Sequence, residues 1–464
     1  MTRRIATTTS PDMRSFIYRT DPSETEFPVM NRRDCLFALG LAPLAVAAGF
    51  DAVRADDWPH WRGPTRDDVW RETGLVEKFA GEQVPIRWRA KIGSGYSGPS
   101  IYQGRVYVTD RVVEPKQIER VHCFDENDGH VIWSYTYDCS YAKVGYQAGP
   151  RASVECDEGR AYALGTMGHL HCFDAAKGEI LWKHDLNAEY DIQMPIWGIT
   201  ASPLIFEDFL IVQVGGKTAC LVAFDKKTGK ERWRALDDRA SYAAPILVEQ
   251  AGKPVVVCMT GDNVVGLDPR TGVVYWTVPF PPRNMPIGVS TPVVSAGRVF
   301  CTSFYDGSLM IKLSEQTLTA ERAWLRVGRD EKKTDALQSI IATPLFLGDY
   351  VYGVDSYGQL RCLDAKNGDR VWENLTAVPA GRWSTIHLTQ NADGRTWMFN
   401  ERGELIIAKL SPQGFEELSR AKLLEPTMEQ LPQRGGVCWS HPGYANKRVF
   451  ARNDVELVCG ELAK

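Results

Sequence analysis

The sequence lacks several features, and each absence excludes a class of protein. Its main apolar run, residues 35–50, is shorter than the roughly 20 residues that a transmembrane helix needs. Lys and Arg (54) are outnumbered by Asp and Glu (58), the net charge is -4, and no basic cluster occurs, so nucleic acid is not an expected partner. The hydrolase motifs Gly-x-Ser-x-Gly and His-Glu-x-x-His are also absent. We therefore expect no transmembrane span in the mature chain and none of the hydrolase classes that use these motifs.

The N-terminus carries the pattern of an export signal. Arg32 and Arg33 precede the apolar run, and Val-Arg-Ala follows it where signal peptidase requires small residues. The paired arginines resemble a twin-arginine signal, the route for proteins exported already folded. We expect residues 1–55 to be the signal segment, with Met30 as a second candidate start. The mature chain is then expected in the periplasm or another exported envelope compartment.

One phrase, Asp-x-x-x-Gly-x-x-x-Trp, recurs along the chain at constant spacing. Identical spacing implies identical backbone: a strand, a tight turn that needs glycine at positive φ, and an outgoing strand. The Asp is expected to cap the turn, and the Trp ring to fill the gap to a neighbouring unit. The copies are Asp125, Gly129 and Trp133; Asp174, Gly178 and Trp182; Asp225, Gly229 and Trp233; Asp268, Gly272 and Trp276; and Asp364, Gly368 and Trp372.

A second marker gives the number of units. A short apolar strand such as "GRVYV" at Gly104 opens each unit and occurs eight times, and units of about 47 residues with four short strands are propeller blades. The last unit lacks a Trp strand, whereas Trp88 precedes the first unit. We therefore predict an all-β, eight-bladed β-propeller of four-stranded antiparallel blades over residues 85–464. The strand around Trp88 closes the ring on the C-terminal blade, and residues 56–84 form an N-terminal extension.

Eleven cysteines are present, which suits a disulfide framework in an oxidising compartment. Their positions favour core packing instead, because four of them hold the same place in four repeats. These four are Cys123, Cys172, Cys362 and Cys459. A bridge between Cys139 and Cys156 remains the alternative.

The stretch "AFDKKTGKERW" at Ala223 closely resembles the tryptophan-docking motif of the PQQ-repeat propellers. That superfamily includes the quinoprotein alcohol dehydrogenases and the propeller subunit of the bacterial outer-membrane assembly machine. The resemblance extends from Trp88 to the C-terminus, and the opening "WPHWRGPTRDDVW" is similar to the start of a family of exported bacterial PQQ-like repeat proteins. It implies the fold but not the chemistry, because catalytic and non-catalytic members share the motif.

Two departures from the quinoprotein dehydrogenases argue against an enzyme. Those proteins generally carry two adjacent cysteines whose disulfide covers the cofactor, and no two cysteines are adjacent here. They also tend to be longer, with insertions that build the active site. No residue of this chain can be matched to their catalytic Asp or calcium ligands.

A candidate binding site follows from the loops that connect the blades. The position three residues before each blade's first Pro-equivalent should lie near the channel mouth. It reads Tyr96, Arg151, Thr200, Tyr242, Val289, Ile341, Trp383 and Trp439. Four aromatics and a cation suit stacking on a flat anion such as PQQ and pairing with its carboxylate. The predicted cofactor-binding residues are Tyr96, Arg151, Trp197, Tyr242, Trp383, His387, Trp439 and His441. In the alternative interpretation, the same side chains only plug the tunnel.

Two other motifs are given a structural interpretation. The glycine-rich residues 93–98 precede a predicted strand, whereas a dinucleotide site requires such a loop to open a helix. His169 and His171 have the spacing to face one side of a strand, but no third metal ligand follows at suitable spacing.

Two functions remain open. The first is an exported binding or scaffold protein whose connector-loop face takes a protein or small-molecule partner in the envelope. The second is a PQQ-dependent oxidoreductase acting on an alcohol or sugar, in which PQQ accepts a hydride, a carboxylate removes the proton and calcium polarises the quinone. The chain has few residues outside the blades and no recognisable set of catalytic residues. Both features favour the binding or scaffold protein.

Overall fold

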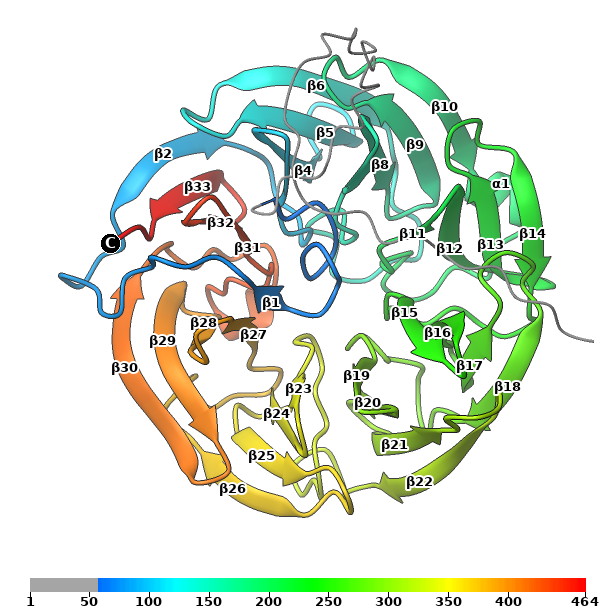
Figure 1. Cartoon of the computed structure of the whole chain (residues 1–464). Helices are drawn as coiled ribbons and strands as arrows, with labels where there is room; N and C mark the ends of the chain where they lie inside the picture. The colour runs from blue at the N-terminus through cyan, green and yellow to red at the C-terminus, as the bar shows by residue number, and fades with distance from the viewer. Residues whose placement is uncertain (1–56) are drawn as a thin grey trace, which may run out of the picture. The chain divides into compact units, whose positions relative to one another are not determined.

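The computed structural model describes residues 57–464, where sheets follow one another around a central channel (Figure 1). The segment predicted as a signal, residues 1–55, lies outside the described residues. The eight sheets confirm the predicted all-β, eight-bladed propeller.

Seven blades are each made of four consecutive antiparallel strands. Blade 1 contains β3 (Ser100–Tyr102), β4 (Arg105–Val112), β5 (Ile118–Asp125) and β6 (Val131–Asp138), and blade 2 contains β7 (Glu155–Asp157), β8 (Arg160–Leu164), β9 (His169–Asp174) and β10 (Ile180–Asp185). Blade 3 contains β11 (Leu204–Phe206), β12 (Phe209–Gly216), β13 (Ala219–Asp225) and β14 (Glu231–Ala235). Blade 4 contains β15 (Ile246–Gln250), β16 (Lys253–Met259), β17 (Asn263–Leu267) and β18 (Val274–Pro279). Blades 5 to 7 consist of β19 (Val293–Ser295), β20 (Arg298–Ser303), β21 (Gly307–Leu313) and β22 (Ala320–Arg326); β23 (Leu345–Leu347), β24 (Tyr350–Val354), β25 (Leu360–Asp364) and β26 (Arg370–Asn374); and β27 (Ile386–Asn391), β28 (Thr396–Asn400), β29 (Glu404–Ser411) and β30 (Gly414–Lys422).

Blade 8 joins strands from distant parts of the chain. Its strands are β31 (Gly443–Ala445), β32 (Arg448–Arg452), β33 (Glu456–Glu461) and β2 (Ile86–Lys91). Trp88 of β2 lies opposite Cys459 of β33, in the register that Trp133 and Cys123 have in blade 1. The predicted closure by the strand around Trp88 is therefore confirmed, and it pairs an edge that would otherwise be open.

Blade 7 departs from the predicted four strands. A fifth strand, β1 (Val69–Trp70), pairs in parallel with β27, with Val69 opposite Gln390. This pairing forms because residues 57–70 cross the centre of the ring (Figure 1), where the inner edge of β27 still offers free backbone groups.

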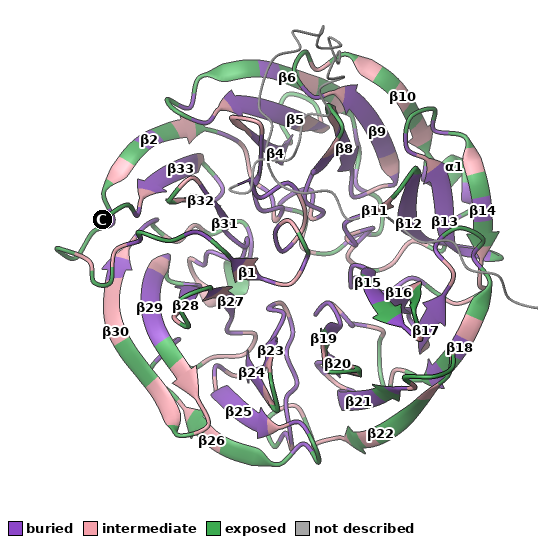
Figure 2. Ribbon diagram, in the orientation of Figure 1, coloured by how far each residue is buried: buried purple, intermediate pink, exposed green. Residues whose placement is uncertain are grey.

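The core lies between neighbouring blades rather than at the centre. In β13, Val222 and Phe224 pack against blade 2, whereas Leu221 and Ala223 pack against blade 4. Because side chains alternate across a strand, a strand with blades on both sides must be apolar on both faces. Figure 2 shows the consequence: most residues of the inner and middle strands are buried, whereas the outer strands β14, β18 and β22 have mostly exposed and intermediate residues.

The repeated motif locks each blade to the next. The Asp carboxylate accepts hydrogen bonds from turn amides, as Asp174 does from the backbone of Ala176 and Lys177 at 3.0 and 2.9 Å. The Trp indole donates to a turn carbonyl of the following blade. These bonds join Trp88 to Glu126, Trp133 to Ala175, Trp182 to Lys226, Trp233 to Pro269, Trp324 to Ala365 and Trp372 to Ser411, at 2.8 to 3.1 Å. Both predicted roles of the motif are confirmed.

The turn glycines of the motif have the backbone that the spacing predicts. Their φ angles lie between 71° and 76°, in the left-handed region that favours glycine. The five are Gly129, Gly178, Gly229, Gly272 and Gly368. The amide of each donates to the carbonyl of the motif Asp four residues earlier, as Gly368 does to Asp364 at 2.8 Å. The five copies therefore share one turn geometry.

The cysteines are core residues. Cys123, Cys172, Cys362 and Cys459 each lie opposite a motif tryptophan on the neighbouring strand and are buried. The alternative of a bridge between Cys139 and Cys156 is wrong, because both thiols are free. Burial raises the pKa of Cys139 and Cys156, as expected for thiols that act as small apolar side chains.

In the part of the chain that the structure describes, helical structure is confined to connectors between blades. The helix α1 (Leu186–Tyr190) follows β10, and the 3-10 turn η1 (Pro432–Arg434) precedes β31. Within residues 57–464, no helix has the length and apolar composition needed to cross a membrane.

Candidate functional site

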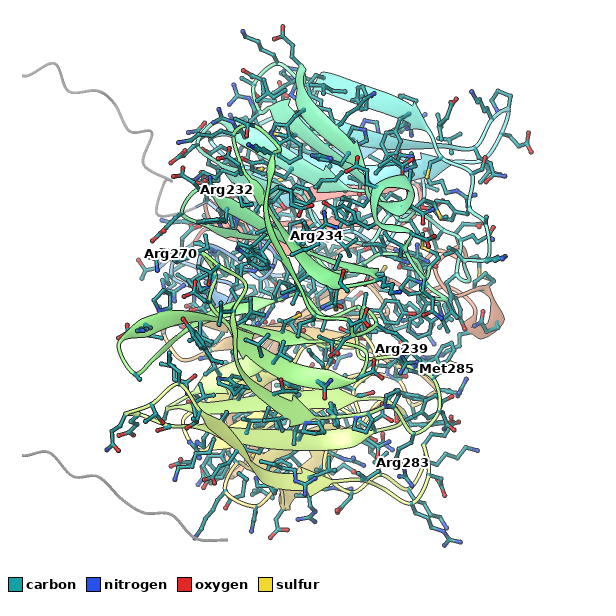
Figure 3. All side chains as sticks on the ribbon, turned by 90° about the vertical axis from the view of Figure 1, so that its right-hand side faces the viewer. Arg232, Arg234, Arg239, Arg270, Arg283 and Met285 are labelled. Carbon is teal, nitrogen blue, oxygen red and sulfur yellow. The ribbon has the colours of Figure 1, made fainter. Side chains whose placement is uncertain are left out.

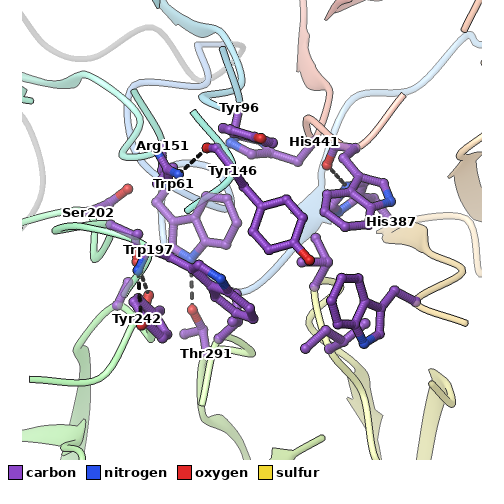
Figure 4. A pocket seen from close by; sticks show the side chains of 17 residues that line it. Trp61, Tyr96, Tyr146, Arg151, Trp197, Ser202, Tyr242, Thr291, His387 and His441 are labelled. Atoms are coloured by element: carbon purple, nitrogen blue, oxygen red, sulfur yellow. Dashed lines mark hydrogen bonds between the residues drawn. The ribbon is translucent and has the colours of Figure 1, made fainter. Parts of the chain in front are cut away.

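A single pocket at the ring axis gathers the residues predicted from the connectors (Figure 4). Each of the eight positions three residues before a Pro-equivalent lines it, one from every blade junction. All eight predicted cofactor-binding residues are brought together here: Tyr96, Arg151, Trp197, Tyr242, Trp383, His387, Trp439 and His441. The cavity has a volume of about 120 Å³. That these residues bind a cofactor stays a prediction.

The pocket opens on the face that carries the connectors. Figure 3 places Arg239, Arg283 and Met285, all from connectors, toward one face of the ring and Arg270, from the β17–β18 turn, toward the other. Connectors and motif turns therefore lie on opposite faces, as a propeller meander requires.

Beneath the circle of aromatic connector residues lie serines, a glycine backbone and a histidine. We call this group the polar tier. His441 Nε2 accepts hydrogen bonds from the Gly98 amide (3.2 Å) and from the Ser153 hydroxyl (2.8 Å). Because Nε2 accepts, the imidazole proton is on Nδ1, 3.2 Å from the Pro442 carbonyl. Ser202 Oγ in turn accepts from the Ser153 amide. This tier ties blades 8, 1, 2 and 3 together at the channel wall.

Both histidines of the pocket are neutral at physiological pH. Burial, and to a smaller extent the neighbouring His387, lower the pKa of His441 to about 3. Burial likewise lowers the pKa of His387 to about 4, although its hydrogen bond to the Trp439 carbonyl (2.8 Å) opposes the shift. His387 Nε2 must donate to that carbonyl, so its Nδ1 carries a lone pair.

Residues 57–70 form the floor. The Trp61 indole donates to Thr291 Oγ1 (2.9 Å), and its ring meets His441 edge to face at 4.4 Å. Trp61, His387 and His441 also line a second cavity of about 20 Å³, so these three side chains separate the two spaces. The channel is thus a pocket with a base rather than an open tunnel.

A fully buried carboxylate anchors this floor. Glu155 accepts hydrogen bonds from the Trp61 amide (3.1 Å), Arg66 (3.4 Å) and the His60 ring (3.0 Å). Three bonds to one buried carboxylate hold residues 60–66 against the inner strand β7.

Three aromatic rings cross the mouth. Tyr146 meets Trp197 at 5.8 Å and Trp383 at 5.6 Å between ring centroids, both edge to face. Tyr146 and Trp383 have positive φ (53° and 69°), which is uncommon for aromatic residues and marks a backbone held by its surroundings. Gln433 donates to the Tyr146 hydroxyl from another connector (3.1 Å). Tyr146 therefore spans the pocket between loops that are distant in sequence.

Arg151 is the cation of the pocket, and its own hydrogen bonds go to backbone carbonyls and one hydroxyl of the chain. Its Nη atoms donate to the carbonyls of Gly145, Tyr146 and Gly149 and to Thr166 Oγ1, and the guanidinium stacks on Tyr96 at 4.8 Å. Arg151 makes no ion pair with a carboxylate among the described residues. It therefore holds the loop under Tyr146 while its positive charge stays uncompensated, with Nε–H as the remaining donor.

The described lining of the pocket contains no acidic residue. None of the 17 described lining residues is Asp or Glu, so the pocket offers no carboxylate ligand for calcium and no carboxylate base. A set of three acidic or imidazole groups does occur at Asp125, Asp128 and His130, but it lies in a turn with Asp128 and His130 exposed. There, Asp125 and Asp128 accept turn amides, which is their ordinary structural role.

The remaining motifs lie in or beside regular strands. His169 and His171 do face the same side of β9, with ring centroids 6.5 Å apart, and both contact Tyr137. The glycine-rich residues 93–98 lead into β3, as the sequence predicts.

Sequence reasoning missed Trp61 and Tyr146. Trp61 lies in the extension "WPHWRGPTRDDVW", which belongs to no repeat, so no register relates it to the ring axis. Tyr146 lies five residues before Arg151 in a connector of no regular pattern, and no repeat aligns it with another blade.

Comparisons with known proteins agree on the fold. The family described as "Outer membrane protein assembly factor BamB" matches residues 117–374. The assembly factor BamB of Burkholderia pseudomallei (strain K96243) is 23% identical over 192 residues, which are 38% of this chain and 48% of that protein. The chain thus spans about half the length of this curated relative.

Solved structures resemble the chain at low identity. BamB from Moraxella catarrhalis has a TM-score of 0.53 at 17% identity, covering 80% of this chain and 97% of its own. A europium-containing methanol dehydrogenase has 0.60 at 13%, covering 87% and 89%, and the quinohemoprotein alcohol dehydrogenase of Comamonas testosteroni has 0.58 at 14%, covering 89% and 82%. These structures share the propeller and carry no conclusion about chemistry. Because the family match extends over more than half of the sequence, the chain belongs to the family described as outer membrane protein assembly factor BamB, among the PQQ-like repeat propellers.

Proposed function

We propose that this chain is an exported, non-catalytic binding protein that holds its partner on the connector face. The observation that carries the proposal is the axial pocket: every blade junction sends one side chain into it, and no described lining residue is acidic. The cavity of about 120 Å³ argues against side chains that merely plug the tunnel. It is a concave, largely aromatic site with few polar groups, which is typical of binding sites.

The surface around the pocket supports a partner on the same face. Ile196, Met285 and Met428, from three different connectors, are 45%, 44% and 52% exposed. Aromatic and methionine side chains are enriched at protein interfaces. Since the relatives are outer membrane protein assembly factors, we propose a protein partner in the envelope.

The alternative, a PQQ-dependent oxidoreductase, fits the pocket poorly. Aromatic walls and Arg151 suit a planar anion, but calcium needs oxygen ligands and proton removal needs a base. The lining residues supply no carboxylate for either role, and about 120 Å³ is small for a cofactor of three fused rings. The described lining therefore gives no support to a redox step at this site.

The first test is a titration of the full-length exported protein with PQQ, with and without calcium, followed by tryptophan fluorescence. Dye-linked oxidation of alcohols and sugars is assayed on the same samples. We expect no turnover and no calcium-dependent quenching. Saturable calcium-dependent quenching together with turnover would overturn the proposal.

The partner is tested by photo-cross-linking in the producing cells, after fractionation has shown the protein in the envelope. A photoreactive side chain placed at Ile196 on the connector face is expected to capture a discrete protein. The same side chain at Val273, 57% exposed in the β17–β18 turn, is the matched control and should capture none. Equal capture at both sites would refute a connector-face interface.

A further inference from the structure

We infer that the axial pocket takes a single aromatic ring that carries a carboxylate. This inference rests on the proposed binding function and specifies its ligand. The shared chemistry has two sources: a free aryl acid, or the aromatic C-terminal residue of a polypeptide. Size, walls and charge of the pocket each contribute to the argument.

Size selects one ring. An engineered apolar cavity of about 150 Å³ in another protein binds benzene, so a cavity of about 120 Å³ has room for one six-membered ring and little more. A larger ligand would have to displace Tyr146, whose ring lies between Trp197 and Trp383. Two further contacts hold Tyr146 in place: Gln433 at its hydroxyl and Arg151 at its carbonyl.

The walls select an aromatic ring. Trp197 and Trp383 stand with centroids 6.5 Å apart at 78°, and Trp383 lies 6.4 Å from Trp439. Tyr242 lies beside Trp197, with centroids 5.1 Å apart and the rings tilted by 32°. Rings set at steep angles to one another offer both faces and edges, the two surfaces against which an inserted aromatic ring packs best.

Charge selects an anion. Among the described lining residues, Arg151 carries the one full charge, because none of the others is Arg, Lys, Asp or Glu and both histidines are neutral. Within residues 57–464, Arg151 has no carboxylate partner and its Nε–H has no hydrogen-bond acceptor. The indole N–H groups of Trp383 and Trp439 are buried without an acceptor in the described part of the chain. A carboxylate supplies both the missing counter-charge and hydrogen-bond acceptors.

The experiment compares ligands that differ in one feature each. Phenylacetate is titrated into the full-length protein by calorimetry beside phenylacetamide, which removes the charge, and cyclohexylacetate, which removes the aromatic ring. We expect saturable one-to-one binding of phenylacetate, with each analogue at least tenfold weaker. If phenylacetamide bound as tightly as phenylacetate, the pocket would not require a negative charge on its ligand. If cyclohexylacetate bound as tightly as phenylacetate, the pocket would not require an aromatic ring.

A second arm identifies the source of the ligand. Ala-Ala-Phe with a free C-terminus is compared with its C-terminal amide and with phenylacetate. Tighter binding of the free peptide, lost on amidation, assigns the pocket to a polypeptide end, whereas tighter binding of phenylacetate assigns it to free acids. Absence of binding by both acids at millimolar concentration would overturn the inference. That failure is distinct from failure of the proposed function, which is signalled by PQQ-dependent turnover.

Variants locate the site. Arg151→Gln is expected to lower the affinity for phenylacetate at least tenfold and to leave the affinity for phenylacetamide unchanged. Trp439→Leu should lower the affinity for both compounds. Arg283→Gln is the control, since Arg283 is exposed on the same face and outside the pocket lining. Arg151 also holds a loop, so the comparison of ligands on the unmodified protein keeps the inference testable if Arg151→Gln fails to fold. An effect of Arg283→Gln equal to that of Arg151→Gln would place the anion elsewhere.

Discussion

The indole of Trp133 lies directly on Gly178 of the next blade. A Cβ added to Gly178 would come within 2.5 Å of the Trp133 ring, and Gly178 also has a φ of 71°. The glycine therefore serves two purposes at once: it makes the turn, and it leaves room for the neighbouring blade's tryptophan. The contact recurs for Trp88 on Gly129, Trp182 on Gly229, Trp233 on Gly272 and, less closely at 3.0 Å, Trp324 on Gly368.

Substitution at this contact should be costly. We expect Gly178→Ala to lower the free energy of unfolding by about 2–5 kcal/mol, from positive-φ strain of about 1–2 kcal/mol and overpacking of about 1–3 kcal/mol. Urea unfolding at constant protein concentration measures this difference in the free energy of unfolding between the unmodified protein and the variant. Gly159→Ala is the matched control, because Gly159 has nearly the same φ (72°) but nothing within 4 Å of an added Cβ. Equal losses in the two variants would show that only backbone strain matters.

The interface between blades 4 and 5 reaches the same result with different residues. Blade 5 lacks the Asp and Gly of the motif, and Trp276 donates instead to Gln250 Oε1 (3.0 Å). The Gln250 amide then donates to the Thr319 carbonyl in the β21–β22 turn (2.7 Å). One glutamine thus relays the hydrogen bond that other tryptophans make directly.

Removal of this relay should destabilise the protein. Gln250→Met keeps the volume but leaves the buried Trp276 N–H without an acceptor, so we expect a loss of about 1–3 kcal/mol in the free energy of unfolding. Gln316→Met in the same turn is exposed and should change it by less than about 0.5 kcal/mol. Similar stability for both variants would contradict the relay.

The fold could be predicted because its rule is local. The spacing from Asp125 to Trp133 recurs in five units, and the unpaired Trp88 shows how the ring closes. Gln250 could not be predicted, since its role depends on a turn 69 residues later that has lost the motif. The fifth strand β1 escaped prediction for a similar reason: it pairs with β27, more than 300 residues away.

The pocket could likewise be predicted only where its residues belong to the repeat. Tyr96, Arg151 and Trp439 could be placed because one register position fixes them all relative to the axis. The bonding of Arg151 could not, because the carbonyls of Gly145 and Tyr146 reach it through an irregular loop. Trp61 reaches the floor only because residues 57–70 cross the ring, which the repeat does not encode.

The floor of the pocket should loosen when its anchor is weakened. Glu155→Gln removes the charge that bonds Arg66 and leaves one acceptor for the Trp61 amide. We expect amide hydrogen exchange in residues 57–70 to accelerate at least tenfold, which corresponds to about 1.4 kcal/mol of local stability, while the blades keep their protection. Glu158→Gln, in the same hairpin but half exposed, is the control. Unchanged exchange would show that packing of Trp58 and Trp61 suffices to hold the segment.

The neutral histidines should make stability fall with acidity. The pKa of His387 is about 4 in the folded state and about 6.5 when unfolded, so between these values the unfolded chain binds more protons. Stability is therefore complete above pH 6.5 and falls as the pH drops toward 4, by up to about 3 kcal/mol for this one group.

Comparison with a variant isolates this contribution. Asp68, whose pKa burial raises to about 6, gives the opposite slope between pH 3.8 and 6, so the pH dependence of one protein mixes both effects. His387→Gln keeps a donor for the Trp439 carbonyl but has no proton to gain. We expect the stability advantage of the unmodified protein over His387→Gln to shrink by about 3 kcal/mol from pH 7 to pH 4, measured by urea unfolding at fixed ionic strength. Parallel stability curves would mean that the pKa of His387 is the same in the folded and unfolded chains, so that the pocket would gain a second cation below about pH 6.5.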